Sequence, residues 1–254
     1  MTGWQLGFLF LAGVGGGLTG SIAGLASLVS YPALLAVGLP PVVANVTNTV
    51  AMIGTTVGSA AGSRQELRGQ GPALWRLCAV TGVGGAVGGA VLLLTPGDTF
   101  EVIVPWLIAL ASVLLMVAPR LRAWALRNAE AGATGTPLGP LTLVASFAVA
   151  LYGGYFGAAA GVMMLALLSV AWTQSLARSN AAKNLAGGAA NVVAAVGFAF
   201  LAPVDWAAAG VLAAGLLIGS RIGPSIVRRV PAAPLRIAIG LAGLALAVSL
   251  WVDR

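Results

Sequence analysis

The chain has 254 residues, of which 59% are hydrophobic and 7% charged, and its mean hydropathy is +1.00. Soluble domains carry about a quarter charged residues, so this composition excludes a soluble globular domain and indicates a polytopic membrane protein. The net charge of +7 comes from 13 basic and six acidic residues. The basic residues gather in connecting segments without interleaved aromatics, which excludes a nucleic-acid-binding protein and indicates basic loops beside a lipid bilayer.

The chain has no histidine and a single cysteine, Cys78. Metal and redox centres therefore lack their usual ligands, and we expect neither a metal site nor a cofactor. An intramembrane enzyme would also lack a general base and a pair of acids at membrane depth, so we expect no catalytic residues. No basic residue precedes the first apolar run, and we expect that run to be a structural segment, not a removed signal.

Eight apolar stretches follow one another along the chain and predict membrane-embedded helices. Backbone at membrane depth must form its hydrogen bonds internally, and none of the stretches alternates in polarity as a barrel strand does. The predicted fold class is therefore an all-α polytopic membrane protein. The stretches cover residues 5–37, 43–61, 73–94, 102–118, 141–172, 181–201, 206–220 and 235–252.

A weak internal repeat divides the chain near its middle. The interval 119–140 is rich in charge and contains a Gly/Thr/Pro run, so we interpret it as a cytoplasmic linker between a first repeat, 1–118, and a second repeat, 141–254. Small and polar residues match in the same order in both repeats. The matching pairs include Gly17 and Gly154, Gly20 and Gly157, Gly24 and Gly161, Asn45 and Asn180, Asn48 and Lys183, Thr49 and Asn184, Thr56 and Asn191, and Trp75 and Trp206.

The charges of the connections predict that the two repeats have opposite orientations. Lys and Arg in short loops stay on the cytoplasmic side, which places the basic segments after residue 61, in the linker and at 221–236 inside. The segments 95–101 and 202–205 hold only acids and are expected outside. Equivalent connections therefore differ in charge between the halves. Inverted repeats of this kind are common in secondary transporters, whose substrate site lies between the halves near the bilayer midplane.

The first apolar stretch of each repeat predicts a broken helical hairpin, followed by three transmembrane helices. Each stretch is too long for one span and too short for two, and glycines interrupt both at matching places, such as Gly20 and Gly157. The N-terminus of a half-helix presents unpaired N–H groups that suit an anion. Close helix packing is the alternative role for each single glycine, as in the Gly84-x-x-x-Gly88 spacing.

The densest polar clusters of the chain follow these hairpins. Their amide and hydroxyl donors can replace the water around a small oxyanion, and hydrogen bonding between helices or helix capping is the alternative. Lys183 is the only lysine and has no acid nearby in sequence. We interpret it as a counter-charge for an anion, with snorkelling towards the cytoplasmic side as the alternative. The predicted substrate-binding residues are Gly20, Asn45, Asn48, Thr49, Gly157, Asn180, Lys183 and Asn184.

Three further residues near the second cluster have two interpretations each. Tyr152 and Tyr155 flank the second break, and we expect them to serve packing, with donation of a hydroxyl group to substrate as the alternative. Arg178 precedes the cluster as either a residue at the substrate entrance or a cytoplasmic anchor.

Several motifs together resemble the TauE/SafE family of sulfite exporters over nearly the whole chain. They are the glycine-rich opening at 15–24, Tyr31-Pro32-Ala33-Leu34-Leu35, Gly38-Leu39-Pro40, Ala44-Asn45-x-Thr47-Asn48-Thr49 and Ser179-Asn180-Ala181-Ala182-Lys183-Asn184. Members of that family are two-repeat integral membrane proteins implicated in moving sulfite, sulfonates and related anions. The resemblance implies a transporter of a small sulfur-containing anion in the bacterial cytoplasmic membrane.

The function expected from repeat, charge and resemblance together is secondary transport of sulfite or an organosulfonate by alternating access. The partners expected are a small anionic substrate and the lipid bilayer, with no nucleic acid. An anion channel of the same fold and a transporter for a different small anion are the alternatives.

Overall fold

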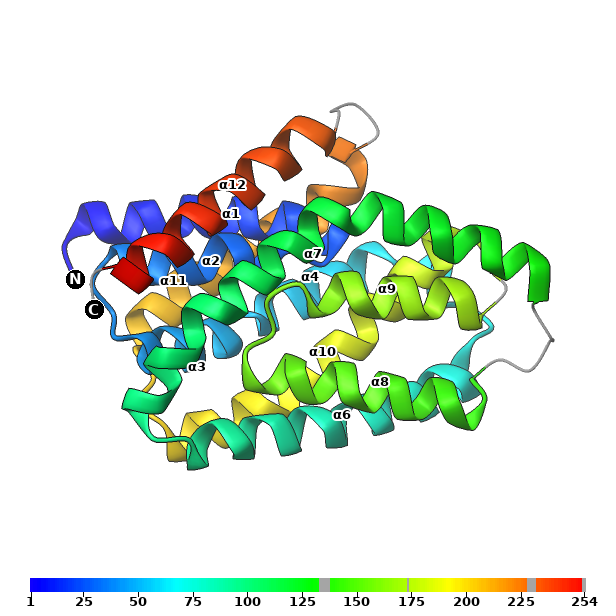
Figure 1. The fold of residues 1–254 in the computed structure, drawn as a ribbon, viewed down its shortest axis with the longest axis horizontal. Coiled ribbons are helices and arrows are strands. Elements are labelled where there is room, and N and C mark those ends of the chain that lie inside the picture. Colours follow the sequence, from blue (N-terminus) through cyan, green and yellow to red (C-terminus); the bar gives the residue numbers. More distant parts are fainter. Residues whose placement is uncertain (133–137, 173, 228–231, 253–254) are drawn as a thin grey trace.

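The computed structural model describes residues 1–132, 138–172, 174–227 and 232–252, and within these ranges the chain forms twelve helices and no strand (Figure 1). The predicted all-α fold class is confirmed. The helices are α1 (Gly3–Ala23), α2 (Ala26–Ala36), α3 (Pro41–Ala51), α4 (Ile53–Gly62), α5 (Arg64–Leu67), α6 (Gly71–Leu94), α7 (Gly97–Gly132), α8 (Pro140–Tyr155), α9 (Ala160–Ala171), α10 (Leu176–Leu201), α11 (Trp206–Val227) and α12 (Ala232–Val252).

Four segments among the described residues are helical, apolar and long enough to cross a membrane: Gly71–Leu94, Gly97–Arg120, Ala177–Leu201 and Trp206–Gly223. Large apolar side chains on these segments stay exposed, including Trp75 and Phe200. An apolar surface of this extent is unfavourable in water and favourable against lipid tails. The helices therefore form a multi-pass membrane bundle.

Both predicted hairpins are interrupted at glycines. α1 ends at Gly24, which has a φ of +75° and donates its N–H to the carbonyl oxygen of Gly20 at 2.8 Å. This left-handed cap ends the helix, and α2 begins two residues later. Between α8 and α9, Gly157 has a φ of +81° and Ala159 one of +61°. Each hairpin is thus two helices separated by a short left-handed turn.

Helices of the first half of the chain pack against helices of the second half, and they do so in matching pairs. α1 packs on α11 and α8 on α6, α4 packs on α11 and α10 on α6, and α2 packs on α12 and α9 on α7. Glycines permit the closest of these contacts, because a Cβ added to Gly84 or Gly88 of α6 would overlap the backbone of α8. Two related halves would produce such matching pairs. The repeat bounds and the inverted orientation stay predictions.

The connections separate by charge along the bundle. Figure 1 shows the N-terminus, the end of α12 and the turns before α7 and α11 at one end of the molecule. The α4–α6 connection, with Arg64 and Arg68, lies at the opposite end, as does the end of α7. This arrangement places the acidic segments 95–101 and 202–205 opposite the basic α4–α6 connection and the end of α7, and which end faces the cytoplasm stays a prediction. Residues 228–231 of the basic 221–236 segment lie outside the described residues.

Two helix boundaries differ from the sequence expectations. α7 continues to Gly132, far beyond residue 118, so the first part of the predicted linker 119–140 is helical and 133–137 lie outside the described residues. Residues 120–130 consist mainly of Ala, Leu, Arg and Glu, which favour a helix even where they are charged. The 43–61 stretch is divided at Met52 into α3 and α4, although hydrogen bonding continues from the Thr56 N–H to the Met52 carbonyl at 3.1 Å.

An aromatic cluster joins the two hairpins to α7. Tyr31 of α2 meets Phe156 edge-on with ring centroids 5.2 Å apart, and Phe100 of α7 meets Tyr155 at 5.8 Å. The contact with Phe100 gives Tyr155 the packing role expected for it. The cluster fixes the second break against the first hairpin and so positions the cavity described next.

Candidate functional site

The two helix breaks meet backbone to backbone. An ideal Cβ on Gly24 would lie 2.5 Å from the Cα of Gly161, and one on Gly161 would lie 2.5 Å from the Cα of Gly24. No larger residue fits at either position without moving one hairpin away from the other. The predicted repeat pairs these two glycines, so the crossing joins the two points that the prediction makes equivalent.

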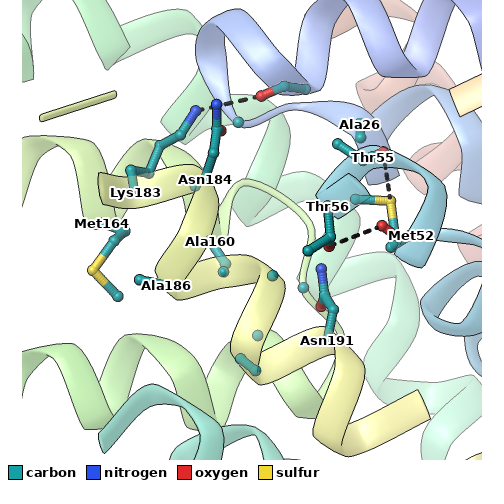
Figure 2. Close-up of a pocket in the computed structure, with 18 of the residues that line it drawn as sticks. Ala26, Met52, Thr55, Thr56, Ala160, Met164, Lys183, Asn184, Ala186 and Asn191 are labelled. Atoms are coloured by element: carbon teal, nitrogen blue, oxygen red, sulfur yellow. Dashed lines mark hydrogen bonds between the residues drawn. The ribbon is translucent and has the colours of Figure 1, made fainter. Parts of the chain in front are cut away.

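A cavity of about 90 Å³ lies beside this crossing (Figure 2). The first turns of both short helices, α2 and α9, contribute to its wall through Ala26, Ser27, Ala160 and Gly161. The first N–H groups of a helix have no partner within the helix and carry the positive end of its dipole. The cavity therefore meets two helix N-termini, together with the last turns of α1 and α8 through Gly20 and Gly153.

Lys183 brings an amino group to the same cavity. Its side chain is 2% exposed and reaches from α10 to the end of α1, where Nζ donates to the carbonyl oxygen of Gly20 at 3.3 Å (Figure 2). An ammonium group has three N–H donors, and this bond is the one that Nζ forms within the described residues. The side chain is thus directed into the protein and does not snorkel to the membrane surface.

Asparagines hold the break of the opposite half in place. Asn180 and Asn184 of α10 donate through Nδ2 to the carbonyl oxygen of Ser21 at 2.9 and 3.2 Å. In the other half, Asn45 of α3 donates through Nδ2 to the carbonyl oxygen of Tyr155 at 2.8 Å. The last carbonyl groups of a helix need such partners. Asn45 and Asn180, which the repeat pairs, therefore form reciprocal contacts between the halves.

Asn48 and Thr49 lie behind the cavity wall and do not line it. Asn48 is 1% exposed and donates to Ser27 Oγ at 3.2 Å, while its Oδ1 accepts from Ser30 Oγ at 2.5 Å. The Thr49 hydroxyl donates to the carbonyl oxygen of Asn45 at 3.0 Å, within its own helix. Of the eight predicted site residues, the structure brings four to the cavity: Gly20, Gly157, Lys183 and Asn184. The other four, Asn45, Asn48, Thr49 and Asn180, are placed around it.

The cavity also contains polar residues that the predicted site leaves out. Thr56 and Asn191 line it, and their pairing in the repeat is the signal that could have identified them. The hydroxyl of Thr56 donates to the carbonyl oxygen of Met52 at 3.2 Å. Ser27 also lines the cavity, and it has no counterpart or motif in the sequence that marks it. Thr55 and Ser59 of α4, Met164 of α9 and Met52, which lies between α3 and α4, also line the cavity.

The two remaining candidates have structural contacts. The Tyr152 hydroxyl donates to the carbonyl oxygen of Ala158 at 2.8 Å and so bridges the second break. Arg178 is exposed, and its Nη2 donates to the carbonyl oxygen of Arg68 at 2.8 Å. That bond ties α10 to the turn after α5.

The apolar helices and the paired breaks beside a cavity containing a buried lysine define a polytopic membrane protein with the features of a transporter. The family described as sulfite exporter TauE/SafE matches residues 9–250, and the chain belongs to that family. The predicted family is thereby confirmed. It is a family of membrane transporters.

Two curated relatives are bacterial proteins with similar names. The chain is 27% identical over 231 residues to the probable membrane transporter protein YfcA of Escherichia coli K12, covering 87% of this chain and 80% of the relative. It is 28% identical over 254 residues to the probable membrane transporter protein ORF9 of a Sinorhizobium species, covering 98% and 93%. No solved structure matches. Together with the membrane-length helices, these relatives make the chain a multi-pass protein of the bacterial inner membrane.

Proposed function

We propose that the protein is a secondary transporter that moves a small sulfur-containing oxyanion, sulfite or an organosulfonate, across the cytoplasmic membrane by alternating access. The observation that carries the proposal is Lys183, a 2% exposed lysine in the wall of a cavity between the two hairpins. The family description, sulfite exporter, supports the choice of a sulfur anion.

A buried ammonium group is costly unless another charge or several acceptors compensate for it. Within the described residues, the hydrogen-bond partner of Lys183 Nζ is one neutral carbonyl oxygen, that of Gly20. The first turns of α2 and α9 add partial positive charge, and the last turn of α1, which contains Gly20, offers only a partial negative charge. An anion in the cavity would supply the missing negative charge, whereas a cationic substrate would be repelled.

The predicted binding residues divide into two groups under this proposal. Lys183, Asn184 and the backbone near Gly20 and Gly157 surround the anion directly. Asn45, Asn48, Thr49 and Asn180 hold the breaks and the cavity wall in position. The breaks come from both halves, so rocking of one half against the other would open the site to alternate sides of the membrane, as in other inverted-repeat transporters.

Counterflow of labelled sulfite into proteoliposomes tests the proposal. We expect saturable exchange by the wild type, competition by sulfoacetate or taurine, and loss of exchange in Lys183→Met. Arg76→Met is the matched control, because it also replaces a cation by methionine, at an exposed position of α6 away from the cavity. This control variant should exchange sulfite like the wild type.

Three results would contradict parts of the proposal. Unchanged exchange in Lys183→Met would remove the cationic anion site. Flux that does not saturate would indicate a channel of the same fold. Folded wild-type protein that moves none of the sulfur anions would remove this substrate class.

A further inference from the structure

Ser27 lines the cavity at the N-terminal end of α2, so its side-chain hydroxyl lies beside the start of a helix. It is the second residue of α2, is 8% exposed, and lines the cavity. Its Oγ lies 3.9 Å from the position that a Cβ of Gly157 would take. The Ser27 hydroxyl therefore lies next to the second break, in the first turn of α2.

The contacts of Asn48 determine whether the Ser27 hydroxyl donates or accepts a hydrogen bond. An amide nitrogen can only donate, so the bond from Asn48 Nδ2 to Ser27 Oγ at 3.2 Å makes Ser27 the acceptor. The opposite orientation of the amide is disfavoured, because the 2.5 Å between Ser30 Oγ and the Asn48 oxygen suits an O–H···O bond and is too short for an N–H···O bond. The Ala26 carbonyl oxygen, 3.0 Å from Ser30 Oγ, is the competing acceptor for the Ser30 proton. The hydroxyl proton of Ser27 takes no part in these bonds, and it has no acceptor in the described part of the chain. Ser27 is therefore a donor that remains free for a ligand.

We propose that Ser27 donates a hydrogen bond to an oxygen of the transported oxyanion, and that Asn48 is the positioning residue that directs the Ser27 proton into the cavity. This inference rests on the proposed anion function and adds to it a ligand residue outside the predicted set. It also gives Asn48 an indirect role, through Ser27, in place of direct contact with the substrate.

The half-saturation constant of sulfite counterflow tests the inference. A hydrogen bond to a charged group contributes about 1.5–3 kcal/mol, so Ser27→Ala should raise the constant about tenfold or more. Ser27→Thr keeps the hydroxyl and should restore most of the affinity. Asn48→Ala should raise the constant by a smaller factor, because the Ser27 proton would then be free to rotate.

The double variant separates positioning from a merely structural role. If Asn48 acts through Ser27, Asn48→Ala should have no further effect on the half-saturation constant in a Ser27→Ala background. Ser146→Ala is the control, since Ser146 is a fully buried serine of α8 that does not line the cavity. It should leave the constant unchanged. Melting temperatures of the purified variants establish that each one is folded.

The outcomes distinguish this inference from the function on which it rests. Saturable flux that is lost in Lys183→Met and unchanged in Ser27→Ala would overturn the role of Ser27 alone. Additive effects of Ser27→Ala and Asn48→Ala would overturn the positioning role of Asn48. A folded wild type that moves neither sulfite nor sulfoacetate would overturn both proposals together.

Discussion

Asn45 and Asn180, like Lys183, donate hydrogen bonds to backbone carbonyl oxygens of distant segments. Asn45 and Asn180 donate to the last carbonyl groups of α8 and α1, and these bonds join segments 110 and 159 positions apart. In both residues Oδ1 is buried and has no partner among the described residues. Each amide therefore contributes as a donor that holds a helix end of the opposite half.

The contact of Asn45 predicts a stability effect that is separate from transport. Asn45→Leu would leave the Tyr155 carbonyl without its donor, and an unsatisfied buried group costs about 1–3 kcal/mol. We expect a lower melting temperature in detergent.

Asn191→Leu is the comparison for this change, because it makes the same replacement in the cavity wall. It should change sulfite exchange more than the melting temperature. Equal melting temperatures for Asn45→Leu and the wild type would exclude the holding role of Asn45.

At the scale of elements, the backbone crossing of the two hairpins determines where the cavity can form. Gly24 and Gly161 bring the turns of the two breaks into direct contact, so the first turns of α2 and α9 reach one cavity. The dipole ends of two helices from different halves then act on the same ligand. A hairpin break alone would provide only one of them.

The crossing predicts that an added methyl group is poorly tolerated at Gly161. Gly161→Ala would place a Cβ against the Gly24 backbone, and overpacking of this kind costs about 1–3 kcal/mol. We expect a lower melting temperature and reduced sulfite exchange.

Gly210→Ala is the matched control, because Gly210 is a helical glycine of α11 with open space where its Cβ would lie. Alanine favours a helix more than glycine does, so this change should leave stability equal or slightly higher. Equal melting temperatures of Gly161→Ala and Gly210→Ala would contradict a tight contact between Gly24 and Gly161.

At the scale of the whole molecule, the two ends of the bundle differ in charge. The acidic turns 95–101 and 202–205 lie with the N-terminus, and the basic α4–α6 connection lies at the opposite end (Figure 1). The retention of basic loops in the cytoplasm predicts that the acidic end faces outwards. This sidedness is also the basis for the predicted inversion of the two repeats.

Labelling of single cysteines in intact cells tests this orientation. Cys78 is the only cysteine, so Cys78→Ser provides a background without thiols. In that background Asp98→Cys should react with a membrane-impermeant maleimide, whereas Gln65→Cys should react only after the cells are opened. Both positions are exposed, so burial does not account for a difference. The reverse pattern would invert the topology.

The sequence by itself determined the helical membrane fold, the family and the two breaks. Hydropathy reports which segments can lie in lipid, and glycine marks places where a helix can end. The same reasoning identified Lys183, because a single lysine in an apolar segment has few roles. It did not determine the end of α7, where helix-forming residues continue the helix past the apolar stretch.

Only the tertiary structure decided which polar residues face the cavity. The predicted repeat pairs Asn48 with Lys183, yet Asn48 contacts Ser27 and Ser30 behind the wall, while Lys183 reaches Gly20. Helical spacing states which side chains share a face, but the packing of other helices determines what that face meets. The partners of Lys183 and Asn45 come from segments 163 and 110 positions away, so no local pattern contains them.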